Sequence, residues 1–99
     1  MKRLVVDVDG TLTQPGSGGS YADVAPRTDV VRRLREYRAR GFEIVLFTSR
    51  NMRTHACNIG RITAHTLPVL LDWLARHDIP YDEIHVGKPW CGFQGYYVV

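Results

Sequence analysis

Two aspartates, Asp7 and Asp9, stand one residue apart at the end of the apolar run in LVVDVDGTLT, residues 4–13. Two carboxylates held about 4 Å apart repel each other by roughly 4 kcal/mol at an effective dielectric constant near 20, so such a pair needs a shared proton or a nearby cation. Mg²⁺ and the ammonium group of a lysine could each supply this cation. One carboxylate can attack phosphorus while the other protonates the leaving oxygen and then activates water. The pair therefore suits phosphoryl chemistry, and the alternative is a strand-end turn in which both acids act as local caps.

Two later segments carry side chains that suit the same chemistry. They are Thr48, Ser49 and Arg50 after the apolar stretch 42–47, and Lys88 after a shorter stretch near 83–86. The hydroxyl and backbone N–H of Thr48 suit a phosphoryl oxygen, and Lys88 would neutralise charge that spreads in the transition state. Arg50 and Arg53 could hold an anionic substrate, although the sequence fits solvated arginines equally well.

Hydrophobic patterning predicts the elements that would position these side chains. Near-continuous apolar runs predict buried strands at 4–8, within 42–50 and around 83–86, and the start of a fourth in 92–99. Apolar stripes predict two helices, one from Thr28 or Asp29 to about Arg40 and one from Thr66 to about His77. The expected buried stripes are Val30, Val31, Leu34 and Tyr37, then Leu67, Leu70, Leu71 and Leu74. Residues 51–65 show no clean period, which predicts an irregular loop or a short helical turn.

The order strand, helix, strand, helix, strand predicts a parallel sheet with right-handed crossovers and helices on both faces. This is an α/β fold with three α/β/α layers, and its ligand site lies beyond the carboxyl ends of the strands. The polar residues that follow each strand should therefore converge, although they are far apart in the chain. The Gly- and Ser-rich stretch 14–26 after the acids is either a flap over this site or a disordered linker.

Composition limits the class of protein. A chain of 99 residues fits one domain, and 44% hydrophobic with 23% charged residues is typical of a globular protein. The net charge of +3 suits an anionic small molecule and is too weak to predict a nucleic-acid-binding domain. No stretch approaches the roughly 18 apolar residues of a membrane span, so we expect no membrane partner. Cys57 and Cys91 lack paired spacing, which favours free thiols in a cytoplasmic protein.

Three segments together resemble the haloacid dehalogenase (HAD) superfamily of phosphohydrolases. They are DVDGTLT at 7–13, FTSR at 47–50 and GKPW at 87–90, in the order and spacing of that family's first three signatures. YADVAP, TSRNMRT, HTLP and VGKPWCGFQGYYV are similar to small members without a cap domain that are associated with capsular polysaccharide biosynthesis. The resemblance covers nearly the whole chain. It implies a HAD-like Rossmannoid fold without a cap and a Mg²⁺-dependent phosphomonoester hydrolase, with a small sugar phosphate as the expected substrate.

The resemblance also implies roles for individual residues. Asp7 would be the nucleophile and a Mg²⁺ ligand, and Asp9 the acid and base that gives the metal its backbone carbonyl. Lys88 would steady Asp7 and the phosphate. The expected substrate-binding residues are Thr48, Ser49, Arg50 and Gly10.

The family's fourth signature is absent from the sequence. One or two acids that complete the metal shell would follow GYYV, where this sequence reads GYYVV and ends at Val99. We therefore expect one domain over 1–99, truncated at the fourth core strand, with an open sheet edge that could support a homo-oligomer. Two alternatives stay open: a phosphate-binding or interaction module with an incomplete metal site, and a phosphatase of nucleic-acid ends prompted by the arginines.

Overall fold

Three short strands form a parallel sheet with the order β1-β2-β3. The structure, a computed structural model, describes residues 2–14 and 20–89. The strands are β1 (Arg3–Asp7), β2 (Glu43–Phe47) and β3 (Glu83–His85), which confirms the three strands predicted from apolar runs. Asp7 pairs with Phe47, and Phe47 pairs with His85, so the three strands end at the same level. The fourth strand predicted within 92–99 lies outside the described residues.

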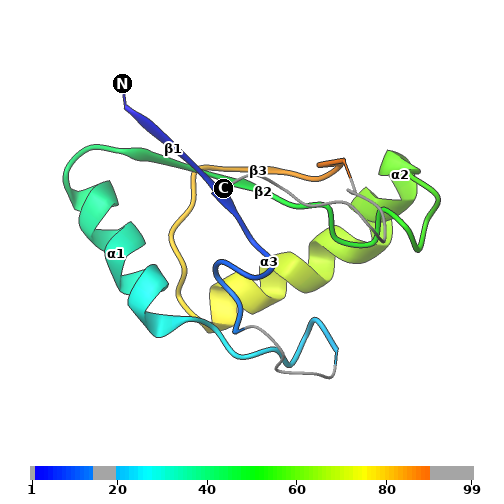
Figure 1. The fold of residues 1–99 in the computed structure, drawn as a ribbon, viewed down its shortest axis with the longest axis horizontal. Coiled ribbons are helices and arrows are strands. Elements are labelled where there is room, and N and C mark those ends of the chain that lie inside the picture. Colours follow the sequence, from blue (N-terminus) through cyan, green and yellow to red (C-terminus); the bar gives the residue numbers. More distant parts are fainter. Residues whose placement is uncertain (1, 15–19, 90–99) are drawn as a thin grey trace.

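The two long helices, α1 (Thr28–Ala39) and α3 (Leu67–Arg76), lie on the same face of this sheet (Figure 1). The core joins alternate strand residues such as Val6 and Leu46 to helix residues such as Trp73. The described residues therefore form two layers, and the prediction of helices on both faces is wrong for this part of the chain. The cause is topological, because right-handed crossovers between strands that advance in one direction place successive helices on one face.

Helix α1 is amphipathic as predicted, but its first residues differ from the prediction. Its N-cap is Arg27, whose side chain makes no capping hydrogen bond, so the prediction of Thr28 or Asp29 as the cap is wrong. The predicted apolar stripe is buried or half-buried in the core. Gly41 follows the helix at φ 91°, a left-handed conformation that glycine adopts without steric cost.

One continuous helical segment begins well before the predicted position. It consists of α2 (Ile59–Arg61), a π-helical turn η1 (Ile62–Thr66) and α3. The true cap is Asn58, whose side-chain oxygen accepts the backbone N–H of Arg61 at 3.0 Å. Thr66 stands at the N-cap position of α3, as predicted, but its backbone is helical and its side chain makes no capping hydrogen bond, because the π turn precedes it. The π turn ends two residues before Pro68, which has no N–H to donate to an α-helical turn.

The buried stripe of α3 also differs from the predicted one. Leu70 and Leu74 are buried as expected, but Leu71 is 37% exposed and Trp73 is fully buried. Leu71 lies about 100° around the helix from Leu70, so the two do not share a face. The indole Nε1 of Trp73 donates a hydrogen bond to the carbonyl oxygen of Val24 at 2.8 Å. This contact ties α3 to the loop that precedes α1.

The loop that follows the two aspartates is closed at its base. The backbone N–H of Gln14 donates to the carbonyl oxygen of Ala25 at 2.8 Å, and the N–H of Arg27 donates to that of Leu12 at 2.7 Å. Residues 15–19, in the middle of the predicted flap, lie outside the described residues. The described part of the loop therefore returns beside residues 12–14, shortly after Asp9 in the chain.

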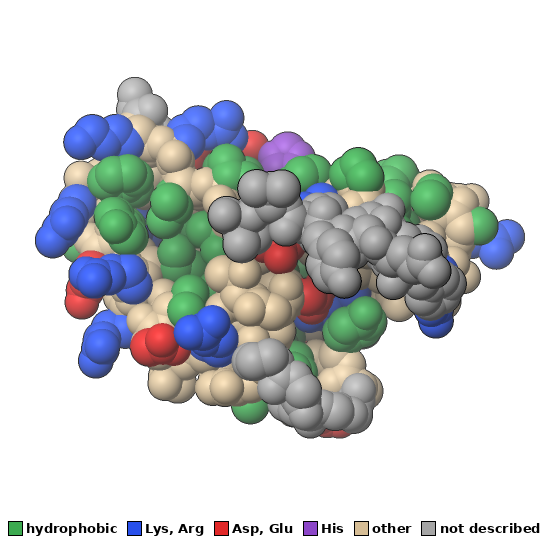
Figure 2. All heavy atoms as spheres, in the orientation of Figure 1, with side chains coloured by type: hydrophobic (Ala, Val, Ile, Leu, Met, Phe, Trp, Pro, Cys, Tyr) green, Lys and Arg blue, Asp and Glu red, His purple; other side chains and the backbone are tan. Residues whose placement is uncertain are grey.

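Basic side chains gather along the edge formed by α1 and the start of β1, with acidic side chains among them (Figure 2). Arg33 pairs with Glu36 at 3.1 Å, and Arg38 pairs with Asp82 at 2.9 Å. This arrangement is a solvated face of mixed charge rather than a continuous basic surface. Within residues 2–14 and 20–89, no helix is long and apolar enough to cross a membrane.

Candidate active site

The carboxyl ends of the strands bring Asp7 and Lys88 together, as the parallel order predicts. Lys88 Nζ lies 3.2 Å from Asp7 Oδ1, and the two side chains are 18% and 32% exposed. The backbone N–H of Lys88 donates to the carbonyl oxygen of Thr48 at 3.0 Å, which continues the pairing beyond β2 and β3. The ammonium group thus stands where it would stabilise negative charge on Asp7 or on a group bound to it.

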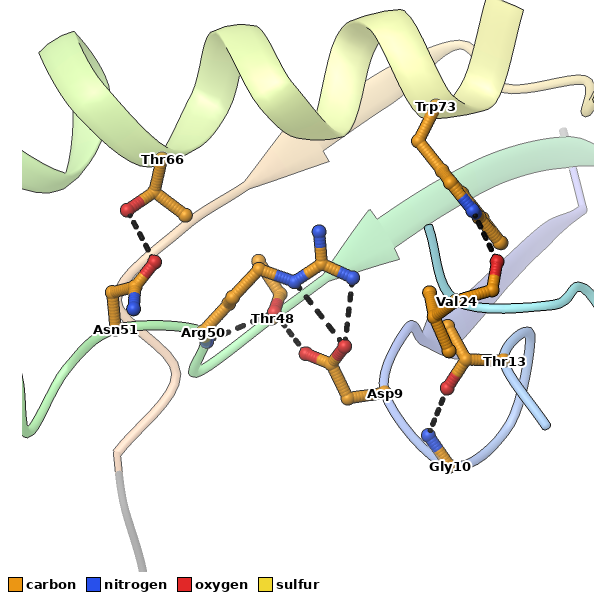
Figure 3. Close-up of polar contacts among 9 residues, drawn as sticks. All are labelled: Asp9, Gly10, Thr13, Val24, Thr48, Arg50, Asn51, Thr66 and Trp73. Atoms are coloured by element: carbon orange, nitrogen blue, oxygen red, sulfur yellow. Dashed lines mark hydrogen bonds and ion pairs between the residues drawn. The ribbon is translucent and has the colours of Figure 1, made fainter. Parts of the chain in front are cut away.

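Asp9 has a separate set of partners, which Figure 3 shows. Its Oδ1 accepts hydrogen bonds from Nε and Nη2 of Arg50, at 3.2 and 2.8 Å. Its Oδ2 accepts the hydroxyl of Thr48 at 3.0 Å. The Thr48 hydroxyl oxygen in turn accepts the backbone N–H of Arg50 at 3.0 Å. These contacts engage both carboxylate oxygens of Asp9 and hold the group in one orientation.

Arg50 lies inside the protein, so the interpretation of a solvated arginine is wrong. Its side chain is fully buried, and its guanidinium carbon lies 4.1 Å from the centroid of the Tyr21 ring. That distance gives a cation–π contact, and the Asp9 carboxylate compensates the buried charge. Its Nη1 has no hydrogen-bond partner among the described residues.

Gly87 sets the path of the chain that delivers Lys88. Its φ is 86°, and a Cβ at this position would lie 2.6 Å from Cδ1 of Ile59. The backbone conformation therefore requires glycine, whereas Cδ1 is the flexible end of the exposed Ile59 side chain and could turn away from a Cβ. The first residue of α2 thus contacts the segment that carries the candidate catalytic lysine.

The remaining predicted substrate-binding residues lie on either side of Asp9. The backbone N–H of Gly10, at φ 82°, donates to the hydroxyl of Thr13 at 2.9 Å, so this donor already has an acceptor. Ser49 lines a recess of about 270 Å³ whose walls are residues 9, 21 and 49–54. We call this hollow the Tyr21 recess. It adjoins the Asp9 carboxylate and opens beside the strand ends.

The oxygen donors of the site suit Mg²⁺, which prefers hard oxygen ligands and keeps several waters. Asp7 would contribute its carboxylate. Asp9 would contribute its backbone carbonyl, the role that the resemblance implies, while its side-chain oxygens contact Arg50 and Thr48. No group of three or more acidic, histidine or cysteine side chains that could hold a metal is found in the described part of the chain. The described donors therefore fit a Mg²⁺ ion that remains largely hydrated.

Two resolved pKa shifts lie at the opposite edge of the sheet, where the strands begin. A hydrogen bond with Glu83, followed by desolvation, raises the pKa of the Glu43 carboxyl. A hydrogen bond with His85 is the largest cause that lowers the pKa of Glu83. Both acids pair with Arg3, at 3.5 and 2.7 Å. Arg3, Glu43 and Glu83 each begin a strand, so these three residues lie at the edge of the sheet opposite to Asp7.

Sequence reasoning missed three residues that shape the site. Tyr21 covers Arg50 from a loop whose sequence has no period to place it. Asn51 adopts φ 60°, and its Oδ1 accepts the hydroxyl of Thr66 at 2.7 Å, which links the loop after β2 to the π turn (Figure 3). An asparagine after a strand is a weak signal for the left-handed conformation. Nothing in the sequence indicates that Thr66 is its partner.

A scan against protein-family models and a search of curated proteins found no match. A search of solved structures found an MCSG target from Vibrio cholerae, known from a crystal structure. The two chains are 56% identical in sequence and superpose with a TM-score of 0.94, over 100% of this chain and 80% of that one. Identity and coverage at this level show common descent as well as a common fold. The chain therefore belongs to the same protein family as this Vibrio cholerae protein.

Proposed function

We propose that this chain is a Mg²⁺-dependent phosphomonoester hydrolase of the HAD superfamily that acts through an aspartyl-phosphate. One observation carries the proposal: two aspartates at one strand end have different cationic partners. Lys88 lies 3.2 Å from Asp7, and Arg50 lies 2.8 Å from Asp9. Two carboxylates in different surroundings can take different roles at one phosphorus atom.

In this mechanism a carboxylate oxygen of Asp7 attacks phosphorus, and the bond from phosphorus to the leaving oxygen breaks. Asp9 gives a proton to that oxygen. Water then attacks the aspartyl-phosphate while Asp9 takes up its proton, which frees Asp7 and releases phosphate. Lys88 stabilises the charge on Asp7 and on the phosphoryl oxygens throughout. Thr48 and Arg50 hold both oxygens of Asp9 in the structure, so one of these hydrogen bonds opens when Asp9 transfers the proton.

A metal ion belongs to this proposal because phosphoryl oxygens develop charge that one lysine compensates only in part. Asp7 and the backbone carbonyl of Asp9 would hold Mg²⁺. The bound ion would neutralise and orient the phosphoryl oxygens. The substrate class proposed from the resemblance is a sugar phosphate of polysaccharide biosynthesis.

The test is hydrolysis of p-nitrophenyl phosphate with and without Mg²⁺. We expect Mg²⁺-dependent release of nitrophenol that EDTA abolishes and added Mg²⁺ restores. Asp7→Asn should lower kcat by at least about 10³-fold, because it removes the nucleophile. Asp29→Asn, an equal change of charge on the exposed face of α1, should keep the wild-type rate. Turnover that survives Asp7→Asn would contradict the mechanism.

One observation favours a second function, a phosphate-binding module without turnover. The part of the chain that the structure describes holds no set of three metal-ligating side chains. A protein of this kind would bind inorganic phosphate in a manner sensitive to Lys88→Ala but would release no nitrophenol at any Mg²⁺ concentration. Calorimetric titration with phosphate beside the hydrolysis assay separates the two functions.

A further inference from the structure

The hydroxyl of Thr48 carries one proton but has two acceptors to serve in the proposed reaction. In the structure it donates to Oδ2 of Asp9 at 3.0 Å, while its oxygen accepts the backbone N–H of Arg50 at 3.0 Å (Figure 3). An ionised carboxylate only accepts hydrogen bonds, so the proton between the two side chains belongs to Thr48. A phosphoryl oxygen bound at Thr48 would need the same proton, and the two demands conflict.

The backbone N–H of Thr48 does not replace the hydroxyl as a donor. It donates to the carbonyl oxygen of His85 at 3.0 Å. Thr48 directly follows Phe47, the register partner of Asp7, and its carbonyl oxygen accepts the backbone N–H of Lys88 at 3.0 Å. Thr48 thus stands beside the candidate nucleophile and its lysine, and its hydroxyl is the one donor it has left for a phosphoryl group at Asp7.

The two contacts that hold the Asp9 carboxylate differ in what their loss costs. Arg50 donates twice to Oδ1, at 3.2 and 2.8 Å, and its side chain is fully buried. Opening this contact would break two hydrogen bonds and leave a buried charge uncompensated. Opening the contact with Thr48 would break one hydrogen bond from a neutral donor. The contact between Thr48 and Oδ2 is therefore the one that opens more easily.

The exposure of the two side chains indicates which of them moves. Thr48 is fully buried, whereas the Asp9 side chain is 36% exposed. A carboxylate that stays bonded to Arg50 through Oδ1 can turn about this oxygen and withdraw Oδ2 from Thr48. The position that Oδ2 leaves suits a phosphoryl oxygen, which is also a pure acceptor.

We propose that the Thr48 hydroxyl exchanges acceptors when a phosphoryl group binds. Its hydrogen bond passes from Oδ2 of Asp9 to a phosphoryl oxygen, and no covalent bond changes in this step. Oδ2 is then free to exchange a proton with the leaving oxygen and with water, while Arg50 still holds Oδ1. Thr48 is thus a positioning residue for Asp9 as well as a ligand of the phosphoryl group. This inference rests on the proposed function, which brings the phosphoryl group to Asp7.

A crystal structure of the wild-type chain with Mg²⁺ and orthovanadate tests the exchange directly. We expect Thr48 Oγ1 to lie about 2.5–3.0 Å from a vanadate oxygen and more than about 3.5 Å from Oδ2 of Asp9. Both contacts between Arg50 and Oδ1 should remain. A bound vanadate that leaves the hydrogen bond between Thr48 and Oδ2 intact, or that breaks the Arg50 contacts instead, would overturn the proposal.

Isothermal titration with inorganic phosphate and Mg²⁺ measures the competition between Asp9 and the ligand. Asp9→Asn keeps an oxygen toward Arg50, which only donates, so the amide turns its Nδ2 toward Thr48 and no longer accepts the hydroxyl proton. We expect phosphate to bind at least about tenfold more tightly to Asp9→Asn than to the wild type. The gain has two causes, the released hydroxyl and the loss of a negative charge.

The Thr48→Val background separates these two causes. Valine has the shape of threonine without its hydroxyl, so Asp9→Asn then removes a negative charge alone. Its gain in phosphate affinity should be about three- to tenfold smaller than in the presence of the Thr48 hydroxyl. Thr48→Ser keeps the hydroxyl and should restore the full gain. The matched control is Thr63→Val, the same change at an exposed threonine bonded to the Ile59 carbonyl, and it should leave phosphate affinity unchanged.

Equal gains with and without the Thr48 hydroxyl would overturn the proposal, and so would an Asp9→Asn protein that binds phosphate no better than the wild type. If Thr48→Val does not fold, the vanadate structure decides. Hydrolysis of p-nitrophenyl phosphate by the wild-type chain is measured in parallel. Exchange without turnover would refute the phosphatase and leave the exchange standing. Turnover without exchange would refute the exchange alone.

Discussion

Asp7 and Asp9 are chemically identical side chains whose partners prepare them for different tasks. Asp7 faces an ammonium group on a flexible stem, which can follow a carboxylate whose charge changes during reaction. Asp9 faces a planar guanidinium that is locked by burial and by the Tyr21 ring. A nucleophile benefits from the first arrangement. A proton-transfer group benefits from the second arrangement, because the rate of proton transfer depends on the orientation of the carboxylate.

Arg50→Lys tests whether Arg50 is a positioning residue. Lysine keeps the charge but cannot contact Asp9 Oδ1 with two nitrogens or stack on Tyr21 in the same way. We expect kcat for p-nitrophenyl phosphate to fall about 10- to 100-fold with a smaller change in KM, because the bound phosphate keeps its contacts. Urea denaturation should show a loss of about 1–3 kcal/mol in the free energy of unfolding.

Arg32→Lys on the exposed face of α1 is the control and should leave both quantities unchanged. An Arg50→Lys protein that is destabilised but hydrolyses at the wild-type rate would show a purely structural role.

The sequence predicts that four side chains of the site lie close together, but it does not predict which residues surround each of them. Asp7, Asp9, Thr48 and Lys88 follow buried apolar runs, and parallel strand ends must meet at one edge. The burial of Arg50 depends on a tyrosine from a loop without periodic pattern. Composition and spacing carry no information about such a contact, so the sequence fits a solvated arginine equally well.

At the scale of elements, the strands are predicted more reliably than the helix that ends at Arg76. Strand prediction rests on short apolar runs, and each run lies within one element. The π turn at Ile62–Thr66 adds residues to one helical turn, which breaks the 3.6-residue period across the segment. Pattern analysis therefore recovers only the part after Thr66. The cap at Asn58 is missed because no apolar stripe follows it at once.

Asn58→Ala should lower the free energy of unfolding by about 1 kcal/mol, the usual cost of losing a side-chain cap. The change removes the acceptor of the Arg61 backbone N–H. Chemical denaturation followed by circular dichroism measures the loss. Asn58→Asp keeps an oxygen in place and adds a favourable charge at a helix start, so it should match the wild type. Equal stability of all three proteins would show that this cap contributes nothing.

At the scale of the whole molecule, α3 fastens the loop that shields the site. Trp73 donates to the carbonyl of Val24, and Arg76 Nη2 donates to that of Ala22 at 2.5 Å. These two bonds hold the backbone at residues 22 and 24, directly after Tyr21. The Tyr21 ring covers Arg50. Helix packing on the far side of the core is thereby coupled to the surroundings of Asp9.

Trp73→Phe should loosen this loop while the sheet stays intact. Phenylalanine keeps most of the buried apolar area but leaves the Val24 carbonyl without its donor, at a cost of about 1–3 kcal/mol. Hydrogen exchange read by mass spectrometry should become faster in residues 20–27 and remain at the wild-type rate in β2. Equal acceleration in β2 would indicate loss of the whole core instead of release of the loop.

The contact between Gly87 and Ile59 has an evolutionary consequence. Position 87 requires a positive φ, and a Cβ there would also meet Cδ1 of Ile59, the flexible end of an exposed side chain. A smaller residue at position 59 would remove this contact but would leave the requirement for a positive φ unchanged. Among relatives, position 59 should therefore drift among aliphatic residues while position 87 stays glycine. A relative without Gly87 would need a different backbone conformation before its lysine. We expect such a relative to catalyse a different reaction.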